Sequence, residues 1–228
     1  MASNPAKKEG VLKTKKAPAF KTSGIPSSAK SFLHTGSGTA RKERTTKGFN
    51  VPEWHEVRLD ADKAMSPDIV SSMTDMSAIG EGSFDALFSS HNLQCLYVHE
   101  VPAALAEFKR VLKPDGFAVI TCPDLQSVCD MVVQNKLTTA IYTSAVGPIT
   151  PIDLLYGHRA SVAGGHSRMA HHCGFTKDVL SATLMAAGFA AIAALQRPHP
   201  YYDLWVIATK SKIDKAVLEQ LVKEHFPN

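Results

Sequence analysis

Glycine and aspartate follow two successive apolar runs of this sequence, and both residue types are suited to holding a nucleoside. His34, Gly36 and Gly38 belong to the segment His-Thr-Gly-Ser-Gly. Glycines after a strand allow a tight turn and a close approach of the backbone to a ligand. Asp60 and Asp62 follow the next apolar run, where a carboxylate can accept hydrogen bonds from both hydroxyls of a ribose. The alternative for an isolated aspartate is a surface residue that caps a turn.

A third group of polar residues could contact a base and border a reacting atom. Asp75 precedes Met76. An aspartate beside an apolar residue can accept from the amino group of an adenine, while the neighbour packs on the ring. Ser90 and His91 end another apolar run, and histidine is the side chain best matched to proton transfer near neutral pH. His91 is therefore the first candidate for a general base, with a structural histidine as the alternative.

The elements that must position these residues alternate between strands and helices. The first helix is predicted from Val98 to Leu112, with Pro102 in its first turn. Such alternation predicts a parallel sheet, which binds ligands at the carboxyl ends of its strands. Apolar runs bounded by Gly, Pro, Asp or Ser predict strands at 31–34, 55–61, 68–71, 84–89 and 117–122.

The C-terminal part predicts a different connection. A helix over 177–187 ends before Gly188, which suits a C-terminal cap. Two further strands are predicted at 190–195 and 204–209. Their connector is too short for a crossover helix, so this pair should be antiparallel.

The order of these motifs resembles the class I S-adenosylmethionine-dependent methyltransferases, and most closely their type 11 group. The turn Leu112-Lys113-Pro114-Asp115-Gly116 is the most specific shared element, and the resemblance covers residues 31–210. It implies an α/β fold: a Rossmann-like, seven-stranded, mostly parallel sheet with an antiparallel C-terminal strand and helices on both faces. It also implies S-adenosylmethionine as the cofactor.

The resemblance assigns roles to the residues introduced above. It implies that Gly36 and Gly38 approach the methionine part of the cofactor and that Asp60 binds the ribose, with Asp62 as its competitor. It places Asp75 and Met76 at the adenine, and Ser90 and His91 beside the sulfonium.

The sequence departs from the family pattern at three places. His34 stands where the family usually has an acid, and Gln94-Cys95 replaces the common Glu-His pair. Residues 39–53 show no apolar stripe, so the first crossover helix should be shortened or absent.

A histidine-rich segment from Gly157 to Phe175 is predicted to close over the acceptor. It holds four histidines and several glycines, of which His158 and His171 are further candidates for the base. Their spacing fits no compact Cys/His pattern, so no metal site is predicted. A partner-binding or merely irregular loop is an equal alternative for the segment.

Composition predicts a single domain with a basic arm. The 228 residues are 44% hydrophobic and 20% charged, which is ordinary globular composition. Residues 1–30 contain seven lysines and one glutamate, so we expect a disordered basic arm followed by a methyltransferase-like domain over 31–228. Four cysteines without C-x-x-C spacing and the lack of a secretory signal predict a cytoplasmic protein, and no apolar run is long enough for a membrane span.

The resemblance implies in-line methyl transfer, and we expect a small-molecule acceptor. Two alternatives stay open. One is a non-catalytic binding or assembly protein with the same fold. The other is a methyltransferase directed to nucleic acid through the basic arm, which the slightly acidic remainder of the chain disfavours.

Overall fold

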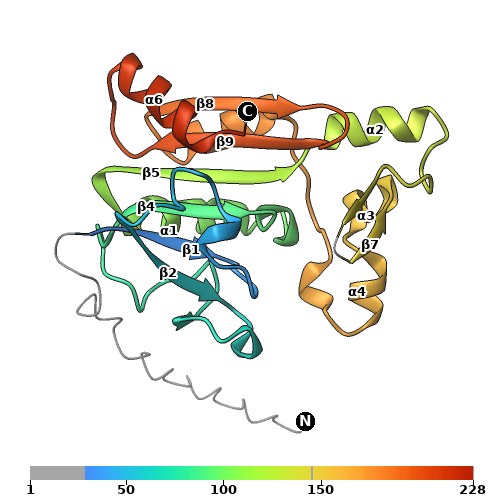
Figure 1. Ribbon diagram of the computed structural model, residues 1–228, viewed down its shortest axis with the longest axis horizontal. Coiled ribbons are helices and arrows are strands. Elements are labelled where there is room, and N and C mark those ends of the chain that lie inside the picture. Colours follow the sequence, from blue (N-terminus) through green and yellow to red (C-terminus); the bar gives the residue numbers. More distant parts are fainter. Residues whose placement is uncertain (1–28, 145, 228) are drawn as a thin grey trace, which may run out of the picture.

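A seven-stranded sheet with the order β3-β2-β1-β4-β5-β9-β8 forms the centre of the computed structural model, which describes residues 29–144 and 146–227 (Figure 1). Strands β1 to β5 run parallel to one another, and β9 runs antiparallel to both β5 and β8. This confirms the predicted fold class. The strands are β1 (Lys30–Thr35), β2 (Trp54–Asp60), β3 (Ile69–Val70), β4 (Phe84–Ser90), β5 (Leu112–Pro123), β8 (Ala191–Arg197) and β9 (Asp203–Thr209).

Both faces of the sheet are buried, as the near-continuous apolar runs require. Leu33 of β1 pairs with Val57 of β2 and Leu87 of β4, and all three belong to one core cluster. Phe32 and Phe88 belong to the cluster on the opposite face. Alternate residues of a strand point to opposite faces, so a single apolar run serves both clusters.

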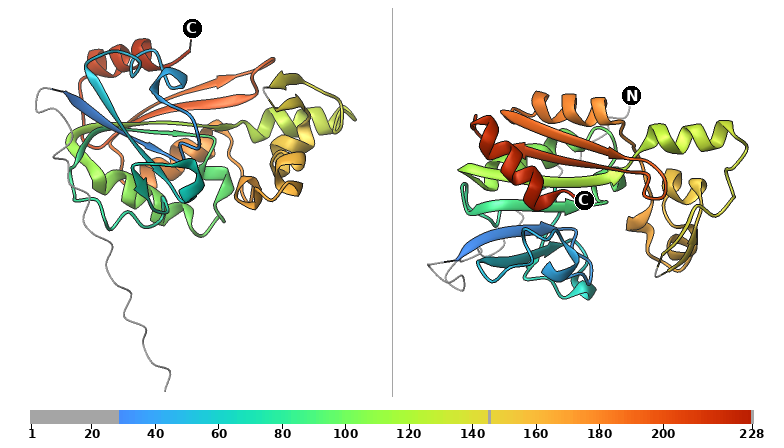
Figure 2. Two further views of the ribbon diagram at one scale, coloured as in Figure 1. Left: turned by 60° about the horizontal axis from the view of Figure 1, so that its bottom comes forward. Right: turned by 45° about the horizontal axis from the view of Figure 1, so that its top comes forward.

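Different elements cover the two faces (Figure 2). Helix α1 (Val101–Val111) and helix α5 (Lys177–Ala186) bury apolar residues in the first cluster. The C-terminal helix α6 (Lys215–His225) and the connection from β1 to β2 pack on the other face. Helix α1 has Pro102 in its first turn, as predicted.

The first crossover contains no α-helix, in agreement with the sequence. Its only helical piece is a 3-10 turn at Lys42–Arg44. The aromatic ring of Phe49 packs this connection against the sheet. It stacks on the ring of Phe32 with 4.3 Å between the ring centroids, and it lies edge-to-face with the ring of Trp54 with 5.1 Å between the centroids. One inserted aromatic side chain thus replaces the apolar stripe of a helix.

The segment between β5 and α5 forms a small lobe beside the carboxyl ends of the parallel strands (Figures 1 and 2). The sequence predicted a loop over Gly157–Phe175, whereas the structure has a short helix and a 3-10 turn within that range. A capping box, in which Thr150 and Asp153 bond reciprocally, starts helix α3. The lobe contains α2 (Leu125–Val133), β6 (Tyr142–Ser144), β7 (Gly147–Ile149), α3 (Pro151–Tyr156), α4 (Arg159–Ala163) and a 3-10 turn at Ser167–Met169.

The predicted basic arm lies outside the described residues apart from its last two positions. Lys30 already belongs to β1, and its ammonium lies 5.6 Å from the centroid of the Trp54 ring. Within the described ranges, no helix has the length and apolar character needed to cross a membrane.

Candidate functional site

The loop after β1 is pressed against the loop after β4. Gly36 and Gly38 have φ angles of +57° and +52°, which favour glycine. A Cβ on Gly36 would overlap the side chain of Asn92, while the Asn92 amide donates to the Thr35 carbonyl at 2.8 Å. The glycine loop therefore lies at the carboxyl edge of the sheet, in contact with the end of β4.

Asp60, at the end of β2, holds this glycine loop directly. Its Oδ2 accepts a hydrogen bond from the Gly38 N–H at 2.8 Å, and its Oδ1 accepts from the Asp62 N–H at 2.8 Å. Each carboxylate oxygen has a second acceptor position, and the residue is half-buried. Asp62 instead caps the 3-10 turn Lys63–Met65 by accepting from the Ala64 N–H.

Arg58, which the sequence analysis did not single out, joins the two loops that flank Asp60. It is 1% exposed, and its guanidinium donates to the carbonyls of Gly38, Met65 and Ser66. Its Nε is buried without a partner among the described residues. The sequence signal was an arginine within the apolar run of β2.

Asp75 and Met76 have opposite environments. Asp75 is exposed, and hydrogen bonds from Ser77 lower the pKa of its carboxyl. Met76 is fully buried in the core, and its N–H donates to Glu107 at 2.6 Å. Contact of the Met76 side chain with an adenine would require this turn to move, so the pair's role stays a prediction.

His34 faces the side of the sheet that carries the first crossover. It is 3% exposed, with its Nδ1 2.7 Å from Glu56 Oε1 and its ring 5.2 Å from that of Phe88. Glu56 Oε2 also accepts from the Lys42 N–H at 3.1 Å. His34 thus connects β1 to the 3-10 turn of the crossover.

Ser90 and His91 end β4 next to β5. Ser90 Oγ lies 2.9 Å from Thr121 Oγ1, and the His91 N–H donates to the Thr121 carbonyl at 2.9 Å. His91 has a φ of +54° and keeps its surface exposed. Desolvation by the surrounding protein lowers the pKa of its imidazole, against the attraction of the Asp203 carboxylate, while His171 and Arg197 lower it further. His91 therefore presents a neutral imidazole at the carboxyl edge.

The two histidines of the lobe are placed differently. His171 Nδ1 donates to the Leu154 carbonyl at 2.9 Å, and burial lowers the pKa of its imidazole. The neutral ring then has its lone pair on Nε2, which lies 3.5 Å from the amide nitrogen of Gln94. His158 bonds Ser161 at the start of α4, 2.7 Å away. His171 lies at the sheet edge, whereas His158 is part of the lobe's own turn.

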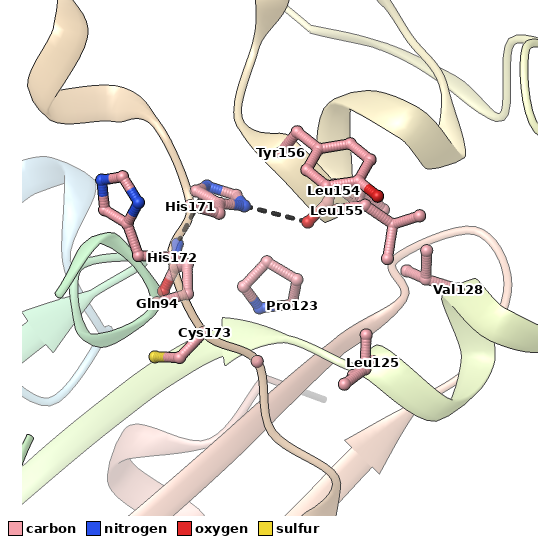
Figure 3. Close-up of a pocket in the computed structure, with 11 residues that line it drawn as sticks. Gln94, Pro123, Leu125, Val128, Leu154, Leu155, Tyr156, His171, His172 and Cys173 are labelled. Carbon is pink, nitrogen blue, oxygen red and sulfur yellow. Dashed lines mark hydrogen bonds between the residues drawn. The ribbon is translucent and has the colours of Figure 1, made fainter. Parts of the chain in front are cut away.

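A cavity of about 170 Å³ lies between the ends of β4 and β5 and the lobe (Figure 3). Gln94, at one end, is 2% exposed, and its Oε1 has no partner among the described residues. The sequence marked Gln94 only as a departure from the family pattern. The lining residues include no Asp, Glu, Lys or Arg: they are Gln94, Pro123, Leu125, Val128, Leu154, Leu155, Tyr156, His171, His172, Cys173 and Gly174.

Unpartnered buried polar atoms gather at this edge of the sheet. Four such side-chain atoms occur among the described residues, and three belong to this region: Arg58 Nε, Ser89 Oγ and Gln94 Oε1. A buried polar atom without a partner is costly, so their gathering here favours a ligand site. The described ranges contain no group of three or more His, Cys, Asp or Glu residues that could hold a metal ion.

Comparisons with known proteins agree with this architecture. Residues 36–120 match the family model described as a methyltransferase domain. A comparison with curated proteins gives no match.

Solved structures share the fold at low identity. The 1,6-didemethyltoxoflavin-N1-methyltransferase of Burkholderia thailandensis, with 1,6-didemethyltoxoflavin and S-adenosylhomocysteine bound, is 15% identical with a TM-score of 0.51, over 81% of this chain and 72% of that one. A S-adenosylmethionine-dependent methyltransferase of Archaeoglobus fulgidus is 12% identical with a TM-score of 0.52, over 79% and 86%. Another, from Methanosarcina mazei, is 14% identical with a TM-score of 0.51, over 86% and 100%. Part of this chain, residues 36–120, therefore matches a methyltransferase domain, and the chain as a whole shares the fold of these S-adenosylmethionine-dependent methyltransferases.

Proposed function

We propose that this protein transfers the methyl group of S-adenosylmethionine to a small-molecule acceptor. One observation carries the proposal: the glycine loop, Asp60 and the end of β4 meet at one edge of the sheet, beside a cavity that Gln94 lines. Open α/β sheets bind ligands at this edge. The first crossover lacks a helix, so the loop relies on side chains for its position.

The residues at this edge fit the cofactor. Gly36 and Gly38 keep the loop free of side chains, and Asp60 has spare acceptor positions for the ribose hydroxyls. S-adenosylmethionine supplies an electrophilic methyl group on a sulfonium when it is bound.

Arg58 and Asp60 hold the loop from two sides. Asp60 accepts from the Gly38 N–H, and Arg58 donates to the Gly38 carbonyl. The same guanidinium bonds the turn after β2 through Met65 and Ser66. These contacts fix two loops that flank the ribose position, which lowers the entropy lost when a ligand binds.

The protein's main catalytic contribution is orientation. Holding a nucleophile in line with a methyl group supplies several kcal/mol of the barrier, about 7–11 in favourable systems. An acceptor hydroxyl or amine also needs a base, and His91 is exposed, neutral and next to the end of β4. His171 has both ring nitrogens directed at protein groups, and we assign it a positioning role. His158, bonded to Ser161, is the less direct candidate.

Binding of S-adenosylhomocysteine, measured by titration calorimetry, tests the cofactor site. Asp60→Ala should weaken binding about 5- to 150-fold, which corresponds to about 1–3 kcal/mol for hydrogen bonds to a charged group. Asp62→Ala is the matched control and should change the affinity less than about threefold. A larger effect of Asp62→Ala would assign the ribose to Asp62.

The absence of heat and of a thermal shift with millimolar ligand would contradict the enzyme proposal. It would favour the alternative of a binding or assembly protein that retains the fold.

A further inference from the structure

We propose that Glu107 and Arg110, on helix α1, are positioning residues for recognition of the cofactor's base: they fix the turn that presents the Asp75 carboxylate to the amino group of the adenine. This rests on the proposed function, because it concerns the base of the same cofactor. The proposal also gives the two residues of the Asp75-Met76 pair different roles. Asp75 contacts the base, whereas Met76 anchors the turn.

Hydrogen bonds connect this turn to the residue proposed for the ribose. Asp60 of β2 pairs with Val70 of β3, and its carbonyl accepts from the Ser71 N–H at 3.0 Å. The Ser71 hydroxyl in turn donates to the Asp75 carbonyl at 2.5 Å. A base is bonded directly to its ribose, so the turn that borders Asp60 is placed to contact the base of a nucleoside held there.

The main chain of the turn is held by side chains of α1. The Met76 N–H donates to Glu107 Oε2 at 2.6 Å, and the Met76 carbonyl accepts from the Arg110 guanidinium at 2.9 Å. Arg110 also donates to the Ile79 carbonyl at 2.8 Å. Met76 and Ile79 are both buried. Two side chains of one helix therefore satisfy main-chain groups of the residue that directly follows Asp75 and of the end of the turn.

Glu107 and Arg110 also hold each other in place. Arg110 Nε lies 2.6 Å from Glu107 Oε1, and a second guanidinium nitrogen donates to Glu107 Oε2 at 2.8 Å. The hydrogen bond from Arg110 lowers the pKa of the Glu107 carboxyl, against the effect of burial. A bidentate pair of a guanidinium and a carboxylate has a defined geometry. The pair is therefore a rigid support for the turn.

The Asp75 side chain is directed to solvent from this fixed turn. It is exposed, and its Oδ1 accepts from the Ser77 N–H at 3.1 Å. An ionised carboxylate accepts at about four positions and donates at none. Asp75 can therefore accept from the amino group of a base in addition to Ser77, but it repels a carbonyl oxygen in the same place. A site built in this way discriminates an amino group from an oxygen.

Titration calorimetry of the purified full-length protein with S-adenosylhomocysteine and with S-inosylhomocysteine tests this role. The second ligand carries an oxygen in place of the amino group of the base. We expect the unaltered protein to bind S-adenosylhomocysteine at least about tenfold more tightly than S-inosylhomocysteine. Asp75→Ala, at an exposed side chain, should reduce this preference to about threefold or less, because it removes the acceptor.

Glu107→Ala should reduce the preference to a similar extent, because the turn then loses its support at the Met76 N–H. Glu107→Gln keeps an oxygen that can accept from that N–H and should retain the preference. Glu219→Ala on α6 removes another helix carboxylate, which lies 3.6 Å from Lys215, and as the matched control it should also retain the preference. A merely structural role of Glu107 would lower the melting temperature and leave the ratio of the two affinities unchanged, since both ligands bind the same folded protein.

Equal affinities for the two ligands in the unaltered protein would overturn the proposal. An unchanged preference in Asp75→Ala or in Glu107→Ala would also overturn it, and the Asp75→Ala comparison alters no buried contact of α1. Binding of S-adenosylhomocysteine by the unaltered protein without a preference refutes the recognition of the base alone. Absence of S-adenosylhomocysteine binding by the unaltered protein refutes the proposed function.

Discussion

At the scale of single residues, similar side chains have different roles because their neighbours differ. Gly36 and Gly38 share a positive φ, yet only Gly36 faces a close neighbour, Asn92. Asp60 and Asp62 are two positions apart, yet Asp60 holds the glycine loop and Asp62 caps a short turn. Such pairs provide matched controls for each other.

Replacing Gly36 by alanine should destabilise the protein more than replacing Gly38. A left-handed φ costs a non-glycine residue about 1–2 kcal/mol, and crowding adds about 1–3 kcal/mol at Gly36, where the new Cβ meets Asn92. A Cβ on Gly38 meets nothing within 4 Å. Urea unfolding should therefore show a loss of about 1–2 kcal/mol for Gly38→Ala and about 2–5 kcal/mol for Gly36→Ala. Equal losses would mean that the contact with Asn92 is unimportant.

The cysteines should differ in their reactivity toward iodoacetamide. Burial raises the pKa of the Cys95 thiol to about 11 and also raises the pKa values of Cys122 and Cys173, while Cys129 is exposed. The thiolate is the reactive form. At pH 8, mass spectrometry should find Cys129 alkylated roughly a hundredfold faster than Cys95. Faster labelling of Cys95 would mean that the end of β4 opens readily.

At the scale of elements, the C-terminal helix α6 replaces a crossover helix on one face of the sheet. His225, its last residue, is 2% exposed, with its ring 4.3 Å from that of Phe49 and its Nδ1 2.7 Å from Thr46 Oγ1. The helix thereby clamps the irregular first crossover. Burial lowers the pKa of His225 to about 4.

The free energy of unfolding should fall as the pH decreases from about 6.5 to about 4. The unfolded chain has a histidine pKa near 6.5 and binds the proton first, so His225 stabilises the fold fully above pH 6.5 and loses that contribution between pH 6.5 and 4. The expected loss between pH 7 and pH 5 is about 2 kcal/mol in urea unfolding.

His225→Phe removes the titrating group and keeps an aromatic ring in the cluster. Its stability should fall by about 2 kcal/mol less than that of the parent protein over the same pH interval. Identical pH profiles would show that His225 is solvated in the folded state.

An ion pair in the lobe links the first residue of α4 to α3. Arg159 Nε lies 2.9 Å from Asp153 Oδ1. Burial alone would raise the pKa of Asp153, but hydrogen bonds from Arg159 and Thr150 outweigh it and hold the pKa well below its usual range. Arg159→Ala should accelerate hydrogen exchange over residues 150–163 and lower turnover, with S-adenosylhomocysteine affinity within about 0.5 kcal/mol of the parent. Arg168→Ala, at an exposed arginine of the same lobe, should change none of these.

Loss of cofactor binding in Arg159→Ala would contradict a role of the lobe in binding the acceptor. It would mean that the lobe is needed for the whole sheet edge.

At the scale of the whole molecule, the composition of the basic arm differs from that of the two core clusters on opposite faces of the sheet. Residues 1–30 contain seven lysines and lack the apolar periodicity of a core element. Deleting residues 2–28 should therefore leave the melting temperature within about 2 °C of the full chain, as measured by calorimetry. A larger decrease would mean that the arm packs on the fold.

The sequence by itself determined most of the fold. The positions of most strands and the antiparallel final pair followed from apolar run length and from the short connector between Leu195 and Leu204, which are local properties. The seven-stranded, mostly parallel sheet was implied by the family resemblance. The missing first crossover helix was likewise visible as the lack of an apolar stripe. The predicted loop over Gly157–Phe175 was less accurate, because short capped helices such as Arg159–Ala163 carry too little periodicity to detect.

The tertiary structure decided which further residues lie at the candidate site. Gln94, Leu154 and His171 meet only when the lobe folds against the end of β4, and no spacing in the sequence encodes that contact. Arg58 likewise became a loop clamp only once Gly38 and Ser66 were brought to its two sides. The periodicity of apolar residues shows which side of a helix or strand is buried. A binding site depends instead on which side chains, distant in the sequence, come into contact in the folded protein.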